Sequence, residues 1–177
     1  PMLIAALVEF GIVWYLSSRI YKLSLASATL WFILFSAING LTLGWIFAVY
    51  KIAIIAKTFF VTAGTFGAMA LIGSTTKKDL TKIGGILFMA LIGLIIANLV
   101  NLFLHSSTMD YIVSIVGVLI FTGLTAWDAQ AIKRNLLMAP DAGESAQKIA
   151  LLGSLSLYLD FINLFLYLLR FFGNNKN

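Results

Sequence analysis

Three carboxyl side chains lie inside long apolar stretches of this 177-residue chain: Glu9, Asp128 and Asp160. At the centre of a membrane helix, an ionisable side chain costs about 2.5–3.5 kcal/mol on insertion scales. A carboxyl in that setting is protonated, paired with another group or facing a wet cavity. Each of the three acids is therefore a candidate for a functional role.

Asp160 belongs to a polar stripe on an otherwise apolar segment. Steps of three and four residues put the members of this stripe near one face of a helix. They are Ser156, Asp160, Asn163, Tyr167 and Arg170. The stripe predicts a helix that lines a polar interior, and a purely structural set of hydrogen bonds is the alternative.

Asp128 and Glu9 sit in two further apolar segments. Asp128 lies within one to two helical turns of Lys133, so an interfacial acid that faces water or pairs with that lysine is the alternative to a functional role. Arg19 follows Glu9 by ten residues, about 15 Å along a helix and on a different face, so the two cannot pair directly. Each of them needs a partner on another helix, or water.

The composition indicates in which kind of protein these acids lie. Hydrophobic residues make up 61% of the chain and charged residues 11%, against about 45–50% and about 25% in soluble domains. This excludes a soluble domain, a disordered chain and a basic nucleic-acid-binding module, so no nucleic-acid partner is expected. The chain is predicted to be an all-α membrane protein, a single domain over residues 1–177, with the lipid bilayer as its surroundings.

Charges and polar clusters divide the chain into six apolar segments, each predicted to be a transmembrane helix. They span residues 2–16, 30–50, 58–73, 83–104, 111–131 and 149–172. In the fourth segment, Asn98 and Asn101 are expected to form interhelical hydrogen bonds. His105 follows it in a loop that is expected to be solvated.

The basic residues predict the orientation of the chain. Eight lie in loops on one side, namely Arg19, Lys22, Lys77, Lys78, Lys82, Lys133, Arg134 and Lys148, and four on the other, namely Lys51, Lys57, Arg170 and Lys176. The side with eight is expected to be cytoplasmic. The loop of residues 105–110 carries no lysine or arginine.

Small residues recur every four positions in the second segment, at Ser36, Gly40, Gly44 and Ala48. Such spacing lets helix backbones approach closely in lipid. Helix packing within the chain is one interpretation, and a surface for another membrane protein is the other.

Enzyme motifs give little support to catalysis. The chain has no cysteine, one histidine, no phosphate-binding glycine loop, no HExxH pair and no Gly-x-Ser-x-Gly. Asp128 and Asp160 meet the minimal count for an intramembrane aspartyl protease, but they lack the Gly-x-Gly-Asp context of such enzymes. We expect no enzymatic activity and no bound cofactor.

The surroundings of the two aspartates resemble signatures of the Bax inhibitor-1 family, most of all its bacterial members. Residues 121–133 read Phe-Thr-Gly-Leu-Thr-Ala-Trp-Asp-Ala-Gln-Ala-Ile-Lys and residues 156–165 read Ser-Leu-Tyr-Leu-Asp-Phe-Ile-Asn-Leu-Phe, and residues 64–79 are also similar. The resemblance implies seven helices with the last enclosed by the other six, in a bacterial inner membrane. Glu9 matches the second family helix, so the first helix is expected to be missing from this chain.

The resemblance also implies a pH-sensitive calcium leak across the membrane. Asp128 and Asp160 match two aspartates that form a proton-sharing pair beside the pore, and Arg19 is the candidate for the arginine that latches them. Calcium takes oxygen ligands, so the aspartate pair is a candidate calcium site, with Glu9 and Asn163 as candidates along the ion's route. Calcium is then the transported ion.

Two other functions remain open. One is a non-transporting regulator that binds other membrane proteins, such as a membrane protease or a cell-death factor. The other is a proton-coupled carrier that uses the same carboxyl groups.

Overall fold

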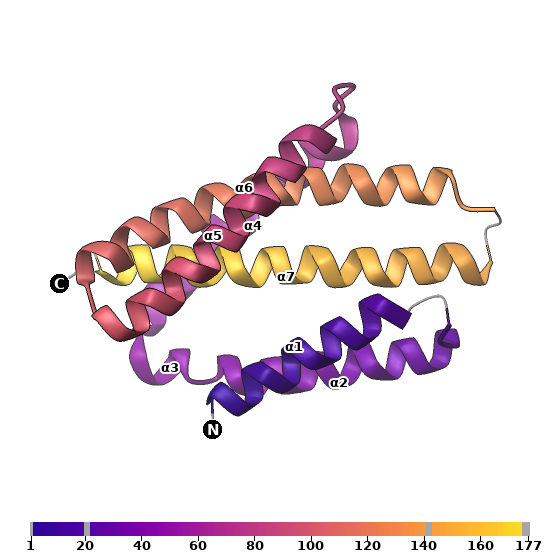
Figure 1. The fold of residues 1–177 in the computed structure, drawn as a ribbon. Coiled ribbons are helices and arrows are strands. Elements are labelled where there is room, and N and C mark those ends of the chain that lie inside the picture. Colours follow the sequence, from indigo (N-terminus) through magenta and orange to yellow (C-terminus); the bar gives the residue numbers. More distant parts are fainter. Residues whose placement is uncertain (1, 20–21, 141–142, 175–177) are drawn as a thin grey trace. The chain divides into compact units, whose positions relative to one another are not determined.

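The computed structural model describes residues 2–19, 22–140 and 143–174; for residues 2–7, 9, 10 and 174 it describes the backbone alone. These residues form helices joined by short connections, with no strand among them (Figure 1). The helices are α1 (Met2–Arg19), α2 (Leu25–Leu43), α3 (Ile46–Val49), α4 (Ile52–Thr75), α5 (Thr81–Leu104), α6 (Ser107–Leu137) and α7 (Glu144–Asn174). The predicted all-α fold is confirmed.

Five helical spans among the described residues are long and apolar enough to cross a membrane. They are Leu25–Val49, Ile52–Thr75, Thr81–Leu104, Ser107–Leu137 and Glu144–Gly173, and they cover the last five predicted segments except for Tyr50. Helix α1 corresponds to the first predicted segment. Most helices run past the predicted ends because charged residues extend the helices beyond their apolar centres: α4 includes Lys57 and α6 includes Lys133.

The second predicted segment is interrupted where it was expected to be continuous. Helix α2 ends at Leu43, and the backbone tightens over Gly44 and Trp45 before α3 begins. Here Phe47 N–H donates to Gly44 C=O at 3.2 Å and Ala48 N–H to Trp45 C=O at 3.0 Å, which are bonds of the 3₁₀ type. Glycine is a poor helix former, which makes Gly44 a natural place for this change.

The chain divides into two compact units, and each is described by itself. The first unit comprises Pro1–Lys51 and Arg134–Leu155, and the second comprises Ile52–Lys133 and Ser156–Asn177. In the first unit α1 lies along α2, and the rings of Tyr15 and Trp31 meet at 5.0 Å between centroids. The aspartates Asp128 and Asp160 both belong to the second unit.

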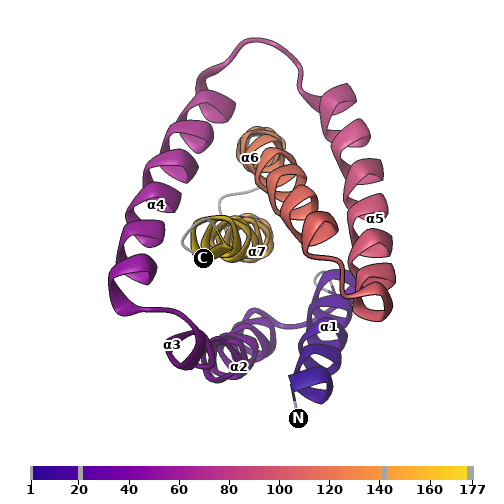
Figure 2. The ribbon, with the colours of Figure 1, turned by 90° about the vertical axis from the view of Figure 1, so that its left-hand side faces the viewer.

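In the second unit, α6 and α7 lie between α4 and α5 (Figure 2). Apolar side chains of α5, α6 and α7 form one buried cluster. Its members are Leu94, Val113, Ile120, Phe121, Leu124, Leu164 and Leu168. The unit is therefore built around the two helices that carry the aspartates.

Glycines allow the helices of the second unit to approach closely. A Cβ added at Gly73 of α4 would overlap the backbone of Ala126 on α6, and one added at Gly117 of α6 would lie 2.7 Å from the ring of Tyr167 on α7. Gly84 of α5 accommodates the indole of Trp127 on α6 in the same way. Small residues at such crossings are typical of helices packed in lipid.

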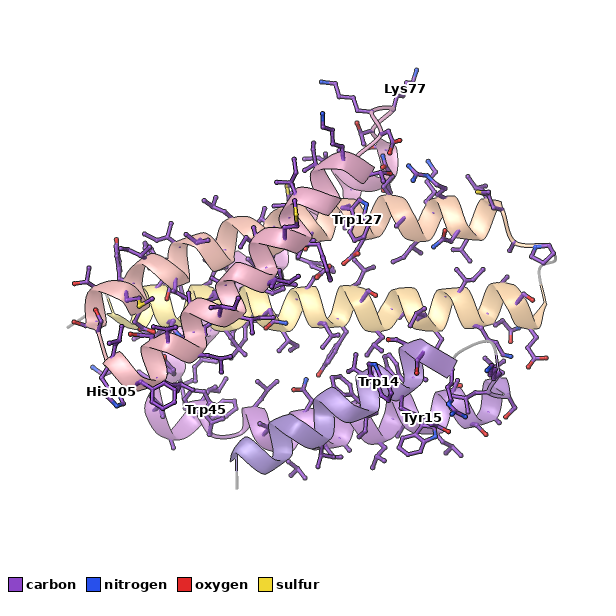
Figure 3. All side chains as sticks on the ribbon, in the orientation of Figure 1. Trp14, Tyr15, Trp45, Lys77, His105 and Trp127 are labelled. Atoms are coloured by element: carbon purple, nitrogen blue, oxygen red, sulfur yellow. The ribbon has the colours of Figure 1, made fainter. Side chains whose placement is uncertain are left out.

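The two ends of α5 differ in charge. Lys77 lies in the loop that precedes α5, and His105 lies at the opposite end of this helix (Figure 3). The helix has 24 residues, so its ends are about 36 Å apart, enough to span the hydrocarbon core of a bilayer. The lysine-bearing α4–α5 loop is the end expected to face the cytoplasm.

Replacing Gly73 with alanine is expected to lower the free energy of unfolding by about 1–3 kcal/mol, because the new methyl group would overlap the Ala126 backbone. The matched control is Gly64→Ala on the same helix, where a Cβ meets no atom within 4 Å. Better helix propensity makes that control neutral or stabilising by up to about 1 kcal/mol. Unfolding of both variants in detergent micelles checks this, and equal stability of the two would contradict the close α4–α6 packing.

Candidate functional site

The side chains of Asp128 on α6 and Asp160 on α7 form a hydrogen bond with each other. Asp160 is almost fully buried, with 5% of its surface exposed, and Asp128 is half-buried. A carboxylate can only accept hydrogen bonds, so a bond between two carboxyl groups requires a proton on one of them. The structure thus brings the two sequence-predicted aspartates into contact with each other.

One oxygen of the buried carboxyl is left over. Within the part of the chain that the structure describes, Asp160 Oδ2 has no hydrogen-bond partner. A buried polar atom in this state costs free energy unless a proton, a water molecule or a bound ion satisfies it. Asp160 Oδ2 is therefore the atom of the pair at which a proton, a water molecule or an ion would bind.

The polar stripe of α7 faces the other helices of its unit, as predicted. Tyr167 Oη accepts a hydrogen bond from Asn98 Nδ2 of α5 at 2.9 Å, which confirms the interhelical bond expected of Asn98. Arg170 Nη1 lies 3.3 Å from Asp110 Oδ1 of α6. With the bond from Asp160 to Asp128, the stripe joins α7 to both neighbours at successive levels.

Aromatic packing holds α7 against α4 beside the pair. The ring of Phe161, the residue after Asp160, meets Phe66 edge-on at 5.3 Å and Phe59 at 5.8 Å between centroids. Asn163 lies one turn further along α7, and its Nδ2 donates to the Leu159 carbonyl at 2.8 Å. This leaves the Asn163 Oδ1 oxygen as a ligand atom of the type that calcium takes.

Lys133 does not form the alternative pair with Asp128 that the sequence left open. Its Nζ donates to the Ser74 carbonyl of α4 at 2.8 Å. Nearby, Gln130 Nε2 donates to the Lys78 carbonyl at 2.7 Å, and Gln130 Oε1 accepts from the Leu80 N–H at 2.9 Å. These three bonds, which we call the loop clamp, tie α6 to the end of α4 and to the α4–α5 loop within five residues of Asp128.

The other two candidate residues lie in α1, which belongs to the first unit. Arg19 is exposed at the end of α1, with its guanidinium 5.8 Å from the centroid of the Tyr15 ring. The Glu9 side chain lies outside the described residues. The roles predicted for Glu9 and Arg19 therefore stay predictions.

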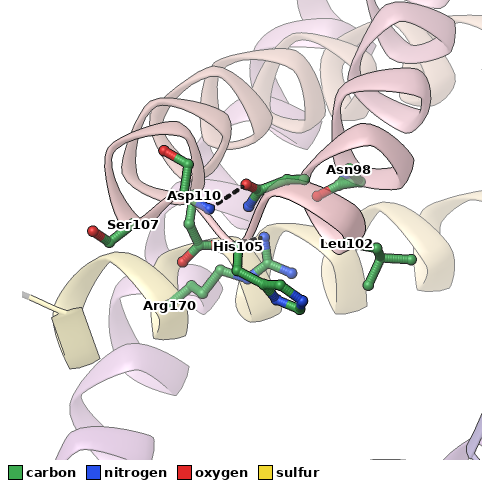
Figure 4. Close-up of a pocket in the computed structure, with 8 residues that line it drawn as sticks. Asn98, Leu102, His105, Ser107, Asp110 and Arg170 are labelled. Atoms are coloured by element: carbon green, nitrogen blue, oxygen red, sulfur yellow. Dashed lines mark hydrogen bonds and ion pairs between the residues drawn. The ribbon is translucent and has the colours of Figure 1, made fainter.

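A second polar cluster lies at the corner between α5 and α6, and it was not predicted from the sequence. A cavity of about 380 Å³ there is lined by Asn98, Asn101, His105, Ser107, Asp110 and Arg170 (Figure 4), and we call it the corner pocket. Asn101 contributes to the corner itself, since its Oδ1 accepts from the Ser106 N–H at 3.0 Å. Only the polar stripe on α7 pointed to this cluster, because its partners lie some 60 residues earlier in the chain.

Metal ligands in this unit are few. No group of three or more His, Asp or Glu side chains gathers in the described ranges 2–19, 22–140 and 143–174. A cation held at the aspartate pair would therefore take its remaining ligands from amide or carbonyl oxygens and water, an arrangement that suits a hard ion such as calcium.

A set of apolar helices with a hydrogen-bonded pair of acids between its last two members defines a multi-pass membrane protein with a buried titratable site. The family model described as "Inhibitor of apoptosis-promoting Bax1" matches residues 1–177. The chain belongs to the Bax inhibitor-1 family, as the signatures around Asp128 and Asp160 indicated.

Relatives agree with this assignment. The chain is 51% identical to the Inner membrane protein YbhL of Escherichia coli over 170 residues, which cover 95% of this chain and 72% of that protein. It is 50% identical to a Borreliella burgdorferi protein over 97% of this chain and 74% of the relative. A Streptococcus pyogenes membrane protein is 42% identical over 97% and 73%. The predicted location, an integral protein of a bacterial inner membrane, is confirmed.

Removing the Gln130 side chain amide is expected to free the α4–α5 loop. In Gln130→Leu, two hydrogen bonds of about 1 kcal/mol each are lost, so local opening and tryptic cleavage after Lys77 or Lys78 should become faster by about tenfold or more. The matched control is Gln147→Leu, at an exposed position of α7. Limited proteolysis in detergent checks this, and equal cleavage rates in the wild type and both variants would show that the loop clamp does not restrain the loop.

Proposed function

We propose that this protein is a pH-sensitive calcium leak channel of the inner membrane, gated by the Asp128–Asp160 pair. The observation that carries the proposal is the hydrogen bond between these two side chains, at a buried position between α6 and α7. Two carboxyl groups in contact titrate as a unit, because the charge of one opposes ionisation of the other.

Loss of the shared proton would convert the pair from a hydrogen bond into two repelling carboxylates. Repulsion at this position would act directly on the contact between α6 and α7, to which the packing of Tyr167 against Gly117 also contributes. Where the α6–α7 contact has two arrangements, a change in pH then changes the relative populations of the two. This is the element of the fold through which protons would gate the ion path.

Calcium would interact with oxygen atoms of the same region. Asp128 and Asp160 supply carboxylate oxygens and Asn163 an amide oxygen one turn away, while Glu9 would line the path from α1. Arg19 would act as a latch that binds the ionised pair and releases the protonated one.

Calcium flux in proteoliposomes tests the gate. Flux through the wild type is expected to change with pH at a fixed calcium gradient, and Asp128→Asn or Asp160→Asn should remove most of that dependence, because neither variant retains a titrating pair. The matched control is Asp79→Asn, an aspartate in the exposed α4–α5 loop, which should keep the wild-type pH profile.

The outcomes separate the candidate functions. An unchanged pH profile in both variants of the pair would contradict the sensor. Absence of flux from the wild type, with a stoichiometric membrane-protein partner on purification, would favour the non-transporting regulator. Flux that saturates and is driven by a pH gradient would favour a proton-coupled carrier.

Arg19→Gln is expected to shift the midpoint of the flux–pH profile without flattening it, because the pair still titrates but loses the cation that binds its ionised form. Lys22→Gln removes a positive charge from the same end of the chain and should leave the midpoint near the wild-type value. The same flux assay over a series of pH values measures both. Equal midpoints in the two variants would contradict the role of Arg19 as the latch.

A further inference from the structure

The polar stripe of α7 runs from the aspartate pair to the corner pocket. Asp160 contacts Asp128 at one end of this stretch, and Arg170 lines the corner pocket at the other. Ten residues of helix, about 15 Å, separate Asp160 from Arg170. Asn163 and Tyr167 lie between them at helical spacing, so Tyr167 is the last member of the stripe before the corner pocket.

We propose that Tyr167 is an outer gate, which separates the corner pocket from Asn163 and the aspartate pair. The corner pocket is then the mouth that a hydrated cation enters, and displacement of the Tyr167 ring admits the cation to the carboxyl groups. The inference deepens the proposed leak and rests on it for the identity of the ion.

The Tyr167 ring fills the α6–α7 interface between the mouth and the pair. A Cβ added at Gly117 of α6 would lie 2.7 Å from this ring, so the ring occupies space that a side chain at position 117 would need. The ring also stacks on Phe121, with 5.8 Å between the centroids and 20° between the planes. Phe121 precedes Asp128 on α6 by about two helical turns. A ring in such close contact leaves no space for a hydrated ion at this level of the interface.

Two residues of the corner pocket hold the Tyr167 side chain in place. Asn98 Nδ2 donates to Tyr167 Oη at 2.9 Å, and the Arg170 guanidinium lies 5.3 Å from the centroid of the ring, within the range of a cation–π contact. Both Asn98 and Arg170 line the corner pocket (Figure 4). Tyr167 therefore lies against the wall of the mouth, where one hydrogen bond and one cation–π contact restrain it.

The corner pocket has the properties of a mouth. It lies at the end of α5 opposite the lysine-bearing α4–α5 loop, which is the end expected to face away from the cytoplasm. Its volume of about 380 Å³ exceeds that of several water molecules, at roughly 30 Å³ each. Asp110 and Arg170 pair there at 3.3 Å, so the charge of the arginine is offset and does not by itself exclude a cation.

The ring and the aspartate pair join the same two helices. A movement of α6 away from α7 at Asp128 and Asp160 would also loosen the contact between Gly117 and Tyr167. The outer gate therefore opens together with the contact at the aspartates, and protonation of the pair controls both.

Labelling of a single cysteine tests the outer gate. The chain has no cysteine, so Asn163→Cys carries one thiol, one turn from Tyr167 on the side of the pair. Spheroplasts that produce this variant are treated with a positively charged, membrane-impermeant methanethiosulfonate without added calcium, and mass spectrometry measures the labelling rate. We expect slow labelling of Asn163→Cys, and labelling faster by about tenfold or more when Tyr167→Ala is added, because the reactivity of a thiol follows its exposure.

Two further variants are the controls. Phe171→Ala removes an aromatic ring from the same end of α7, one that stacks on Tyr111, and should leave the labelling of Asn163→Cys slow. Ser107→Cys places the thiol in the corner pocket itself and should be labelled rapidly with Tyr167 in place.

Tyr167→Phe is the second variant, for the case that Tyr167→Ala does not fold. It keeps the ring and loses only the hydrogen bond from Asn98, so the labelling of Asn163→Cys should become faster by about threefold or more. An unchanged rate in Tyr167→Phe would then count against the gate.

Three results would overturn the proposal. They are rapid labelling of Asn163→Cys with Tyr167 in place, an equal rate when a folded protein also carries Tyr167→Ala, and the same acceleration by Phe171→Ala. Slow labelling of Ser107→Cys would overturn it as well, because the corner pocket would then not be the mouth.

The labelling result is independent of the calcium leak, because no calcium is present in the assay. Labelling that depends on Tyr167, together with absence of calcium flux from the wild type, would support the outer gate and contradict calcium as the ion. Calcium flux from the wild type without any effect of Tyr167 on labelling would support the leak and contradict the outer gate.

Discussion

The hydrogen bond between Asp128 and Asp160 is the constraint on which the second unit depends. Two acids in an apolar environment are tolerated only when they share a proton or hold a cation, so α6 and α7 must place them in contact. Close packing of Tyr167 against Gly117 and of Phe161 against Phe66 keeps the two helices and α4 in register for that contact. Packing and polar chemistry therefore specify the same arrangement.

The helices around the pair are fixed at both ends by polar groups. At one end Gln130 and Lys133 of α6 bind backbone groups of α4 and of the α4–α5 loop. At the other end Arg170 of α7 meets Asp110 of α6. A movement of α6 against α7 at the aspartates would therefore also displace groups at the α4–α5 loop and at the corner pocket. The same two helices carry all three features.

Much of this organisation could be predicted from the sequence. Apolar length predicts the spans, and three- and four-residue spacing places Asp160, Tyr167 and Arg170 on one face. The break at Gly44 and the loop clamp of Gln130 could not be predicted, since a tightened turn and a side chain that binds distant backbone leave no periodic signal. The Asp110–Arg170 contact depends on how two helices rotate against each other, which single-helix patterns do not determine.

Infrared titration of the carboxyl groups, in the same vesicles that are used for calcium flux, shows directly whether the Asp128–Asp160 pair holds the gating proton. We expect a protonated-carboxyl band that disappears over the pH range in which flux changes, is absent from Asp160→Asn and is altered in Asp128→Asn. A wild-type band that does not change across that range, or one that persists unaltered in both variants, would contradict the claim that this pair holds the gating proton.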